Sequence, residues 1–333
     1  MLSDLTLPAL REYRPEVAEP ADFDEFWASE LATARARAAE PLFAAADAGI
    51  RHAEVFDVTF PGYGGESVRA WLLVPRQLAP QPALVVEYIG YGGGRGNPFD
   101  WLTWSCAGHL HMIMDTRGQG SSWRASDTPD PGDSGAPSTP GFMTRGIADP
   151  RGYYYTRLFI DAARATDAAR RHPAAAGLPL VTTGSSQGGG LSIAAAHLGD
   201  GVAACLPDVP FLAHPRRAVD VIDTRPYSEL AEYCRVHAGQ VDQVFATLSY
   251  IDVVNHGKRA TAPALFSAGL ADTITPPSTI FAAFNHYAGP KDISVFPFSG
   301  HEGGETTHFL AQLDFVTRLV AGGAAGQPGA AAG

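Results

Sequence analysis

Hydrophobic residues follow three patterns along this chain, and each pattern predicts a different kind of element. Between residues 20 and 39 they recur at helical spacing, which predicts an N-terminal helix packed on the main body. In residues 53–60 and 67–74 they alternate with polar ones on either side of a Pro- and Gly-rich turn. Alternation with such a turn predicts a β-hairpin, here at an antiparallel edge of a sheet.

The third pattern is a set of short, continuous apolar runs. They occupy residues 83–86, 110–114, 180–183, 202–206, 263–268 and 292–297. Such runs are typical of parallel strands buried on both faces. Helix-favouring stretches separate several of them, for example at residues 153–172 and 191–198. The chain is therefore expected to form an α/β fold, with a mostly parallel, twisted sheet and helices on both faces.

Two segments interrupt this rhythm. Residues 118–150 are rich in Gly, Pro, Ser and Asp and predict a long, functional loop or a lid. Residues 210–256 contain two short helical patterns, 227–237 and 240–250, and are interpreted as an insertion that caps the site or forms a subunit contact. Residues 1–320 are expected to form one domain. Within this scheme residues 1–50 are a helical extension and residues 321–333 a flexible, Ala/Gly-rich tail.

Composition narrows the classes of function. The chain has 333 residues, 45% of them hydrophobic, and a formal net charge of −11 with no basic tract. Binding to nucleic acid or to an anionic membrane is therefore not expected. No apolar run is long enough for a membrane span, and the first ten residues do not resemble a secretory signal. Together with three cysteines outside any C-x-x-C motif, this predicts a cytoplasmic protein.

Ser186 stands in the pattern Gly184-Ser185-Ser186-Gln187-Gly188, between a strand-like run and a helix-like run. This is the G-x-S-x-G pattern of a nucleophile elbow. The chain reverses so sharply there that only glycine is tolerated on either side, and the serine side chain is left exposed. Ser186 is therefore the candidate nucleophile.

A nucleophilic serine needs a base, and the base needs a carboxylate to orient it. Asp272 and His301 follow two successive strand-like runs, in the chain order Ser, Asp, His. Because the carboxyl ends of parallel strands meet at one crevice, the three residues are expected to form a triad. The alternative for Asp272 is a helix N-cap, and for His301 an ordinary surface or core histidine.

Two backbone N–H groups are candidates for an oxyanion hole, which binds the negative charge that develops on a substrate carbonyl oxygen. One belongs to Gln187, after the nucleophile, and the other to Tyr91 in the glycine-rich loop 90–96. The spacing of that loop does not match a phosphate-binding loop. Nor does the chain contain H-E-x-x-H, and His109 with His111 lacks further ligands, so neither a metal nor a cofactor is expected.

Several motifs agree in order and spacing with those of one family. They are Arg117-Gly118-Gln119, the elbow from Gly184 to Gly188, Asp272-Thr273-Ile274-Thr275-Pro276, and His301-Glu302. With residues 23–27 and 208–212 they make the chain resemble carbohydrate esterase family seven, the acetyl xylan esterases and cephalosporin C deacetylases. The resemblance runs from about residue 5 to about residue 320.

This resemblance implies an α/β-hydrolase fold, an intracellular location and a ring-like homohexamer to which the insertion contributes contacts. It also implies that Tyr91 and Gln187 supply the oxyanion donors, and that Arg117 and Gln119 brace the site. Four residues near these motifs are candidates for the substrate pocket: Trp123, Pro210, Phe211 and Ile274. The stretch 121–141 does not match the family motif by motif.

The function predicted from these observations is that of a serine esterase. It would remove acetyl groups from short acetylated xylo-oligosaccharides and from cephalosporin-type esters, through an acetyl-serine intermediate. Two alternatives stay open from the sequence. One is an esterase, lipase or peptidase with a different acyl preference, and the other is a non-catalytic binding protein on a hydrolase scaffold.

Overall fold

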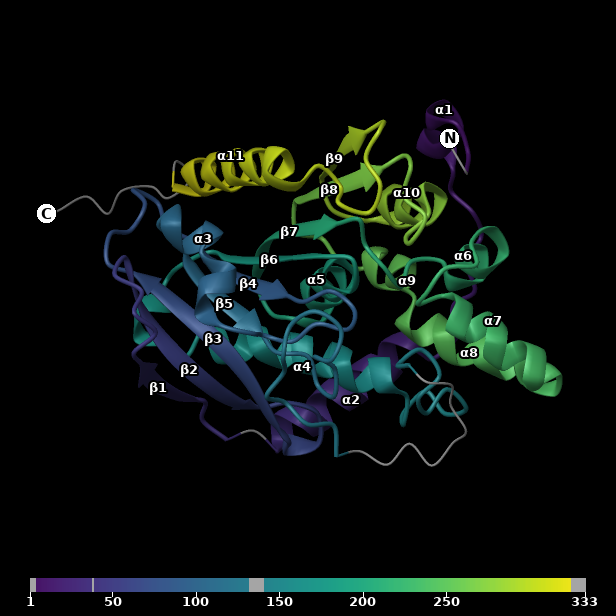
Figure 1. Cartoon of the computed structure of the whole chain (residues 1–333), viewed down its shortest axis with the longest axis horizontal. Helices are drawn as coiled ribbons and strands as arrows, with labels where there is room; N and C mark the ends of the chain where they lie inside the picture. Colours follow the sequence, from purple (N-terminus) through teal and green to yellow (C-terminus); the bar gives the residue numbers. More distant parts are fainter. Residues whose placement is uncertain (1–3, 38, 132–140, 325–333) are drawn as a thin grey trace, which may run out of the picture.

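A twisted sheet runs through the centre of the computed structural model, which describes residues 4–37, 39–131 and 141–324 (Figure 1). Its nine described strands lie in the order β1-β2-β3-β5-β4-β6-β7-β8-β9. They are β1 (Leu42–Ala46), β2 (Ala53–Pro61), β3 (Ser67–Pro75), β4 (Leu84–Tyr88), β5 (Leu110–Met114), β6 (Leu180–Ser185), β7 (Val202–Asp208), β8 (Ala264–Gly269) and β9 (Lys291–Phe296). Strands β4 to β9 form the parallel part of the sheet. The pairs β1–β2, β2–β3 and β3–β5 are antiparallel.

The continuous apolar runs form the parallel part of the sheet, as predicted. Every residue of β5 and β8 is buried, because helices cover both faces of the sheet there. The alternating segments form the hairpin β2–β3, whose strands pair from Ala53 opposite Pro75 to Pro61 opposite Ser67. The predicted α/β architecture is thus confirmed.

Helices α4 (Tyr154–Ala169), α5 (Gln187–Leu198) and α10 (Pro277–His286) belong to the large core on one face of the sheet. Helix α11 (Glu305–Ala324) and the short α3 (Thr103–Cys106) pack on the other face, where Val316 and Trp104 meet residues of β4, β6, β7 and β8. The predicted N-terminal helix is α2 (Phe23–Ala36), which follows α1 (Leu7–Glu12). Trp27 of α2 stacks on Phe159 of α4, with ring centroids 5.7 Å apart.

Four helices lie between β7 and β8, where the sequence predicted an insertion. They are α6 (Pro215–Val221), α7 (Ser228–Val236), α8 (Val241–Ile251) and α9 (Val253–Gly257). Helices α7 and α8 match the two predicted helices to within two residues at each end. Figure 1 shows this pair projecting at one end of the molecule, away from α3 and α11.

Two expectations about the chain ends were wrong in part. Residues 1–50 are not only a helical extension, since β1 adds an antiparallel edge strand outside the predicted hairpin. Helix α11 continues to Ala324, so the first residues of the expected tail are helical, and residues 325–333 lie outside the described residues. In the long loop, residues 118–131 and 141–150 form no helix or strand, and residues 132–140 lie outside the described residues as well.

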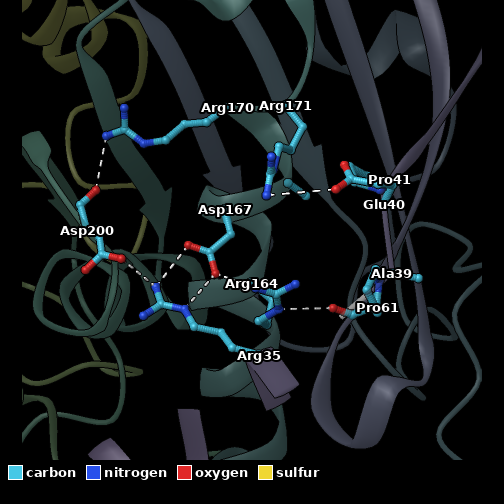
Figure 2. Close-up of a pocket in the computed structure, with 11 residues that line it drawn as sticks. Arg35, Ala39, Glu40, Pro41, Pro61, Arg164, Asp167, Arg170, Arg171 and Asp200 are labelled. Carbon is cyan, nitrogen blue, oxygen red and sulfur yellow. Dashed lines mark hydrogen bonds and ion pairs between the residues drawn. The ribbon is translucent and has the colours of Figure 1, made fainter. Parts of the chain in front are cut away.

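Charged side chains join α2 to the body of the domain. Arg35 of α2 binds Asp167 of α4 through two nitrogens, both at 3.0 Å, and also Asp200 after α5 at 2.9 Å. Arg164 of α4 donates to the same Asp167 at 2.5 Å, as Figure 2 shows. This network surrounds a cavity of about 540 Å³ that none of the predicted site residues lines. Because its arginines already pair with carboxylates or carbonyl oxygens, we interpret it as structural.

Candidate active site

Ser186 occupies the turn between β6 and α5 in a strained conformation, with φ 59° and ψ −118°. A positive φ is costly for a residue other than glycine, and such strain persists only where the surroundings impose it. Here Ser186 N donates to Asp208 O at 2.9 Å, and its carbonyl accepts from Gly190 N and Phe211 N at 3.0 and 2.9 Å. The turn therefore holds the backbone from both sides while the side chain reaches the surface of a cavity.

The glycines flanking Ser186 are required by close contact with β4. A Cβ atom on Gly188 would lie 2.1 Å from the carbonyl oxygen of Tyr88, and one on Gly184 would lie 2.6 Å from the same atom. Gly184 also has a φ of 158°, at the edge of the region that favours glycine. The steric reason predicted from the motif thus applies to both positions.

Asp272 and His301 come together as the sequence predicted. His301 Nδ1 lies 2.9 Å from Asp272 Oδ2, and Asp272 is completely buried. Asp272 also accepts bonds from Ile274 N at 2.7 Å, Thr275 N at 2.9 Å and the Thr275 hydroxyl at 2.7 Å. Asp272 is thus not a helix N-cap, since α10 has Pro276 at its N-cap position, and the three bonds from the turn 274–275 orient the carboxylate instead. A carboxylate at Nδ1 keeps the proton there and leaves Nε2 free to accept one.

Ser186 and His301 line the same cavity of about 420 Å³. The other residues of its wall are Gly90, Tyr91, Trp123, Ser185, Arg225, Pro226 and Ile274. No hydrogen bond joins the Ser186 hydroxyl to His301 among the bonds of the described residues. Such bonds often tighten only when substrate is present.

One of the two expected oxyanion donors, Tyr91, lines this cavity, whereas Gln187 follows Ser186 in the chain and is itself buried. Gln187 is the first residue of α5, so its N–H has no acceptor within the helix. Tyr91 lies in the cavity wall, and no described residue accepts a hydrogen bond from its N–H. The neighbouring Gly92 N is occupied, since it donates to Gln119 Oε1 at 2.6 Å.

Gln119 connects the two sides of this arrangement. Besides Gly92 N, it binds Gln187 Oε1 at 2.8 Å and the Tyr154 hydroxyl at 2.9 Å through its Nε2. The Gln187 side chain in turn donates to Ile89 O at 3.0 Å. The Gln187 side chain is thus buried and structural, so only its backbone N–H remains as a candidate oxyanion donor.

Arg117 and Gly118 lie next to Gln119 in the loop after β5 and hold that loop in place. The Arg117 side chain is fully buried and binds Asp161 of α4, with Nη2 2.9 Å from Oδ1, and Glu66 at 2.6 Å. Gly118 has a φ of 66°, and a Cβ atom there would lie 2.7 Å from Asp130 Cβ. Glu302 is exposed and accepts a bond from Gly300 N at 2.9 Å. Hydrogen bonds from its own N–H and that of Gly300 lower the pKa of the Glu302 carboxyl.

Two of the four pocket candidates do not line the cavity. Trp123 and Ile274 are in its wall, whereas Pro210 and Phe211 are buried behind it. Phe211 packs against Tyr227 instead, with ring centroids 4.5 Å apart. The sequence reasoning missed Arg225 and Pro226, which line the cavity from the segment before α7, and Thr275, which donates to Asp272. The D-x-x-x-P motif contains Thr275 and was the one signal that could have indicated it.

In the part of the chain that the structure describes, no three His, Cys, Asp or Glu side chains are grouped so that they could hold a metal ion. The two histidines considered at the sequence level make other contacts. His111 Nε2 lies 2.7 Å from Glu87 Oε2, and His109 Nδ1 accepts a bond from Ala83 N at 3.1 Å. Both serve the core of the sheet. No described helix is both long and apolar enough to cross a membrane.

Comparison with known proteins identifies the family. The model of the acetyl xylan esterase family matches residues 1–319, which is nearly the whole chain. The chain belongs to the acetyl xylan esterase family. It is therefore a carboxylic ester hydrolase that acts on acetyl esters, and its fold is that of an α/β-hydrolase.

Two solved acetyl xylan esterases agree with this assignment. That of Paenibacillus sp. R4 is 34% identical, covers 94% of this chain and 99% of its own, and superposes with a TM-score of 0.88. Acetyl xylan esterase 1 from Thermoanaerobacterium sp. JW/SL YS485 is 32% identical, with coverage of 95% and 99% and a TM-score of 0.87. The acetyl esterase Axe7A of Xylanibacter ruminicola is 28% identical over 178 residues, which are 52% of this chain but only 38% of that protein.

Proposed function

We propose that this member of the acetyl xylan esterase family is a serine esterase in which Ser186, His301 and Asp272 carry the reaction. The observation that carries the proposal is the joint geometry of two features. A serine at φ 59° shares a cavity with a histidine whose Nδ1 lies 2.9 Å from a buried carboxylate. The N–H groups of Tyr91 and Gln187, which have no acceptor among the described residues, complete the proposed arrangement.

In the proposed reaction, Ser186 Oγ attacks the acetyl carbonyl carbon while His301 Nε2 takes the hydroxyl proton. The N–H groups of Tyr91 and Gln187 donate to the oxygen that becomes negative. The tetrahedral intermediate collapses, the C–O bond to the alcohol breaks, and His301 returns the proton to the leaving oxygen. Water then attacks the acetyl-serine with His301 again as the base, which releases acetate and restores Ser186. Asp272 orients His301 throughout and stabilises its positive charge.

The proposed substrates are small acetyl esters, namely short acetylated xylo-oligosaccharides and cephalosporin-type esters. The printed names of the similar structures support the acetylated xylan part, and the resemblance of the sequence motifs supports the cephalosporin part. The wall residues Trp123, Pro226 and Ile274 supply an apolar surface beside Ser186, on which a sugar ring or a β-lactam ring can pack. A homohexamer in the cytoplasm belongs to the same proposal, and it rests on the resemblance alone.

The substitution Ser186→Ala tests the mechanism. It should reduce acetate release from 4-nitrophenyl acetate by a factor of about 10⁴ or more, because the nucleophile is lost. Thermal unfolding should show that the variant still folds. Ser29→Ala, on the exposed face of α2, is the matched control and should retain full activity. Nearly unchanged turnover in Ser186→Ala, or a fluorophosphonate that labels another residue, would refute the assignment.

The acyl preference is tested separately with a series of 4-nitrophenyl esters of increasing chain length. We expect kcat/KM to be highest for acetate and to fall with each added methylene. A maximum at long chains would favour the lipase-like alternative. Acetate release from acetylated xylo-oligosaccharides and from cephalosporin C then distinguishes the two proposed substrate classes, and a native mass near six times 35.1 kDa would support the hexamer.

A further inference from the structure

Glu229 lies in the first turn of α7, within the insertion, yet its side chain is buried beside the active site. Its carboxylate accepts a hydrogen bond from the Tyr91 hydroxyl at 2.8 Å and one from Met143 N at 3.2 Å. Burial raises the pKa of the Glu229 carboxyl, while the bonds from Tyr91 and Met143 act in the opposite direction. Burial of a carboxylate costs free energy unless the group is hydrogen-bonded. This carboxylate is hydrogen-bonded to two other segments, at Tyr91 and at Met143.

The segment 141–143 closes around this carboxylate. A Cβ atom on Gly141 would lie 2.0–2.2 Å from the carboxyl atoms of Glu229, so only glycine leaves room there. Phe142 N donates to the Tyr91 hydroxyl at 2.9 Å, and the Phe142 ring meets the Tyr91 ring edge-on at 5.7 Å. The hydroxyl of Tyr91 thus donates to Glu229 and accepts from Phe142, which leaves its side chain a single orientation.

The backbone of Tyr91 is held at its other end. Its carbonyl accepts a bond from Trp123 Nε1 at 2.9 Å, and Gly92 N is bound by Gln119. The side chain, the carbonyl and the following N–H are thus all bound, whereas the N–H of Tyr91 itself has no acceptor among the described residues. Glu229 fixes the side-chain end of this arrangement.

We propose that Glu229 is a positioning residue, which holds Tyr91 so that its N–H points at the oxyanion of the substrate. This inference rests on the proposed function, because it assumes that Tyr91 is an oxyanion donor. Glu229 acts through Tyr91 and needs no contact with substrate. Displacement of a hydrogen-bond donor by about 1 Å can lower the rate roughly a hundredfold. A residue that sets the position of the donor therefore affects the rate.

Four variants test the proposal with steady-state kinetics on 4-nitrophenyl acetate. Tyr91→Phe removes the hydroxyl but keeps the N–H, and Glu229→Ala removes its acceptor. Each should lower kcat by roughly tenfold to a hundredfold with KM changed by less than about threefold, since a transition-state interaction is lost. The double variant should be no slower than the slower single one, because both act on the same link. Glu229→Gln keeps one acceptor oxygen and should lie between Glu229→Ala and the wild type.

Glu232→Ala is the matched control. Glu232 lies on the same helix, three residues later, and contacts Arg225 at 3.8 Å as Glu229 does at 4.0 Å, but it makes no bond to Tyr91. It should keep the kcat of the wild type. An equal loss in Glu232→Ala, a rise of KM at constant kcat, or unchanged kinetics in Tyr91→Phe would overturn the role of Glu229. If Glu229→Ala does not fold, Tyr91→Phe still decides.

The outcome for the wild type separates this inference from the proposed function. If the wild-type protein does not hydrolyse the ester through Ser186, the proposed function fails. If the wild type is active through Ser186 and Tyr91→Phe and Glu229→Ala have its kcat, only the positioning role fails. A burst of 4-nitrophenol, measured in each active variant, reports whether the loss occurs in acylation, the first step that needs the oxyanion donors.

Discussion

At the scale of single residues, the site depends on how few hydrogen-bonding options each group has. Asp272 Oδ1 accepts from Ile274 N and Thr275 N, and Oδ2 accepts from Thr275 Oγ1 and faces His301 Nδ1. All four partners are donors, so a fully ionised carboxylate satisfies them and no other side chain of this size does. The geometry therefore determines which nitrogen of His301 carries the proton.

Asp272→Asn tests this reasoning. The variant keeps an acceptor at Oδ1 but places an NH₂ group opposite His301 Nδ1, which favours the tautomer with the proton on Nε2. His301 can then no longer accept the proton of Ser186, and kcat should fall by about 10³–10⁴. Steady-state kinetics with 4-nitrophenyl acetate measure this fall in kcat.

The control for this variant is Asp314→Asn, at an exposed ion pair with Arg318 on α11. It should keep kcat within about twofold, since exposed pairs of this kind contribute little. Thermal unfolding should show both variants folded. A folded Asp272→Asn protein with nearly full kcat would mean that His301 is oriented by another group.

The residues that the sequence could indicate are those whose role follows from a local motif. Ser186, Gly184 and Gly188 belong to one short pattern, and Asp272 and His301 each follow a recognisable strand. Glu229 carries no such mark, because its partners Tyr91 and Met143 are 138 and 86 positions away along the chain. Phe211 is the opposite case. It was predicted to line the pocket because it lies close to a motif in the sequence, but in the structure it is a buried core residue.

At the scale of elements, buried apolar runs were sufficient to predict the parallel strands, but weaker patterns were not. Strand β1 is Leu-Phe-Ala-Ala-Ala, a short apolar run in which three of the five residues are alanine, a weak strand former, and none of its residues is buried. Helices α10 and α11 were also not predicted. Helix α11 is held by Val316 against the sheet, a contact between distant parts of the chain that local spacing does not reveal.

Arg117 joins three elements and should therefore matter for stability as well as for the site. It connects the loop after β5 to Asp161 of α4 and to Glu66 before β3. With Arg117→Gln, Asp161 would stay fully buried with Tyr63 N as its remaining donor at 2.8 Å. Removal of one partner from a buried ion pair costs about 3–5 kcal/mol, because the other charge is left uncompensated. Urea denaturation should show a loss of this size.

Arg76→Gln provides the comparison for Arg117→Gln. The Arg76–Glu54 pair joins the residue after β3 to β2 on the surface, with both side chains more than half exposed. Its loss should change the free energy of unfolding by about 0–1 kcal/mol. Equal effects of the two substitutions would show that the buried network around Arg117 is not what stabilises this region.

At the scale of the whole molecule, burial of ionisable groups couples stability to pH. The surface is acidic overall, with a formal net charge of −11, but several groups are enclosed in the core. Burial lowers the pKa of His197 to about 4 and raises that of Asp252 to about 7. The neutral form of each group is thus favoured by folding, and each contributes to the stability of the domain with its own pH dependence.

Asp252 gives the sharpest test of this coupling. It is the N-cap of α9, and its Oδ1 accepts from His214 N at 3.0 Å and Val254 N at 2.9 Å. Burial raises its pKa from 3.8 to about 7, against the opposing effect of these two bonds. Between these values the folded state binds more protons than the unfolded state, so this contribution is fully present below about pH 4. It is lost as the pH rises through about 7.

Asp252→Asn removes the ionisation but keeps an oxygen that can accept both bonds. The stability of the variant relative to the wild type should therefore increase between pH 4.5 and pH 8, by about 1.4 kcal/mol per pH unit up to about pH 7. Urea denaturation at pH 4.5, 6 and 8 measures this difference. The exposed Asp242 of α8 provides a control, since replacement of an exposed carboxylate in Asp242→Asn should change the free energy of unfolding by less than about 0.5 kcal/mol. A pH-independent difference for Asp252→Asn would show that Asp252 is already ionised in the folded protein at acid pH, and that its burial is compensated by charges nearby.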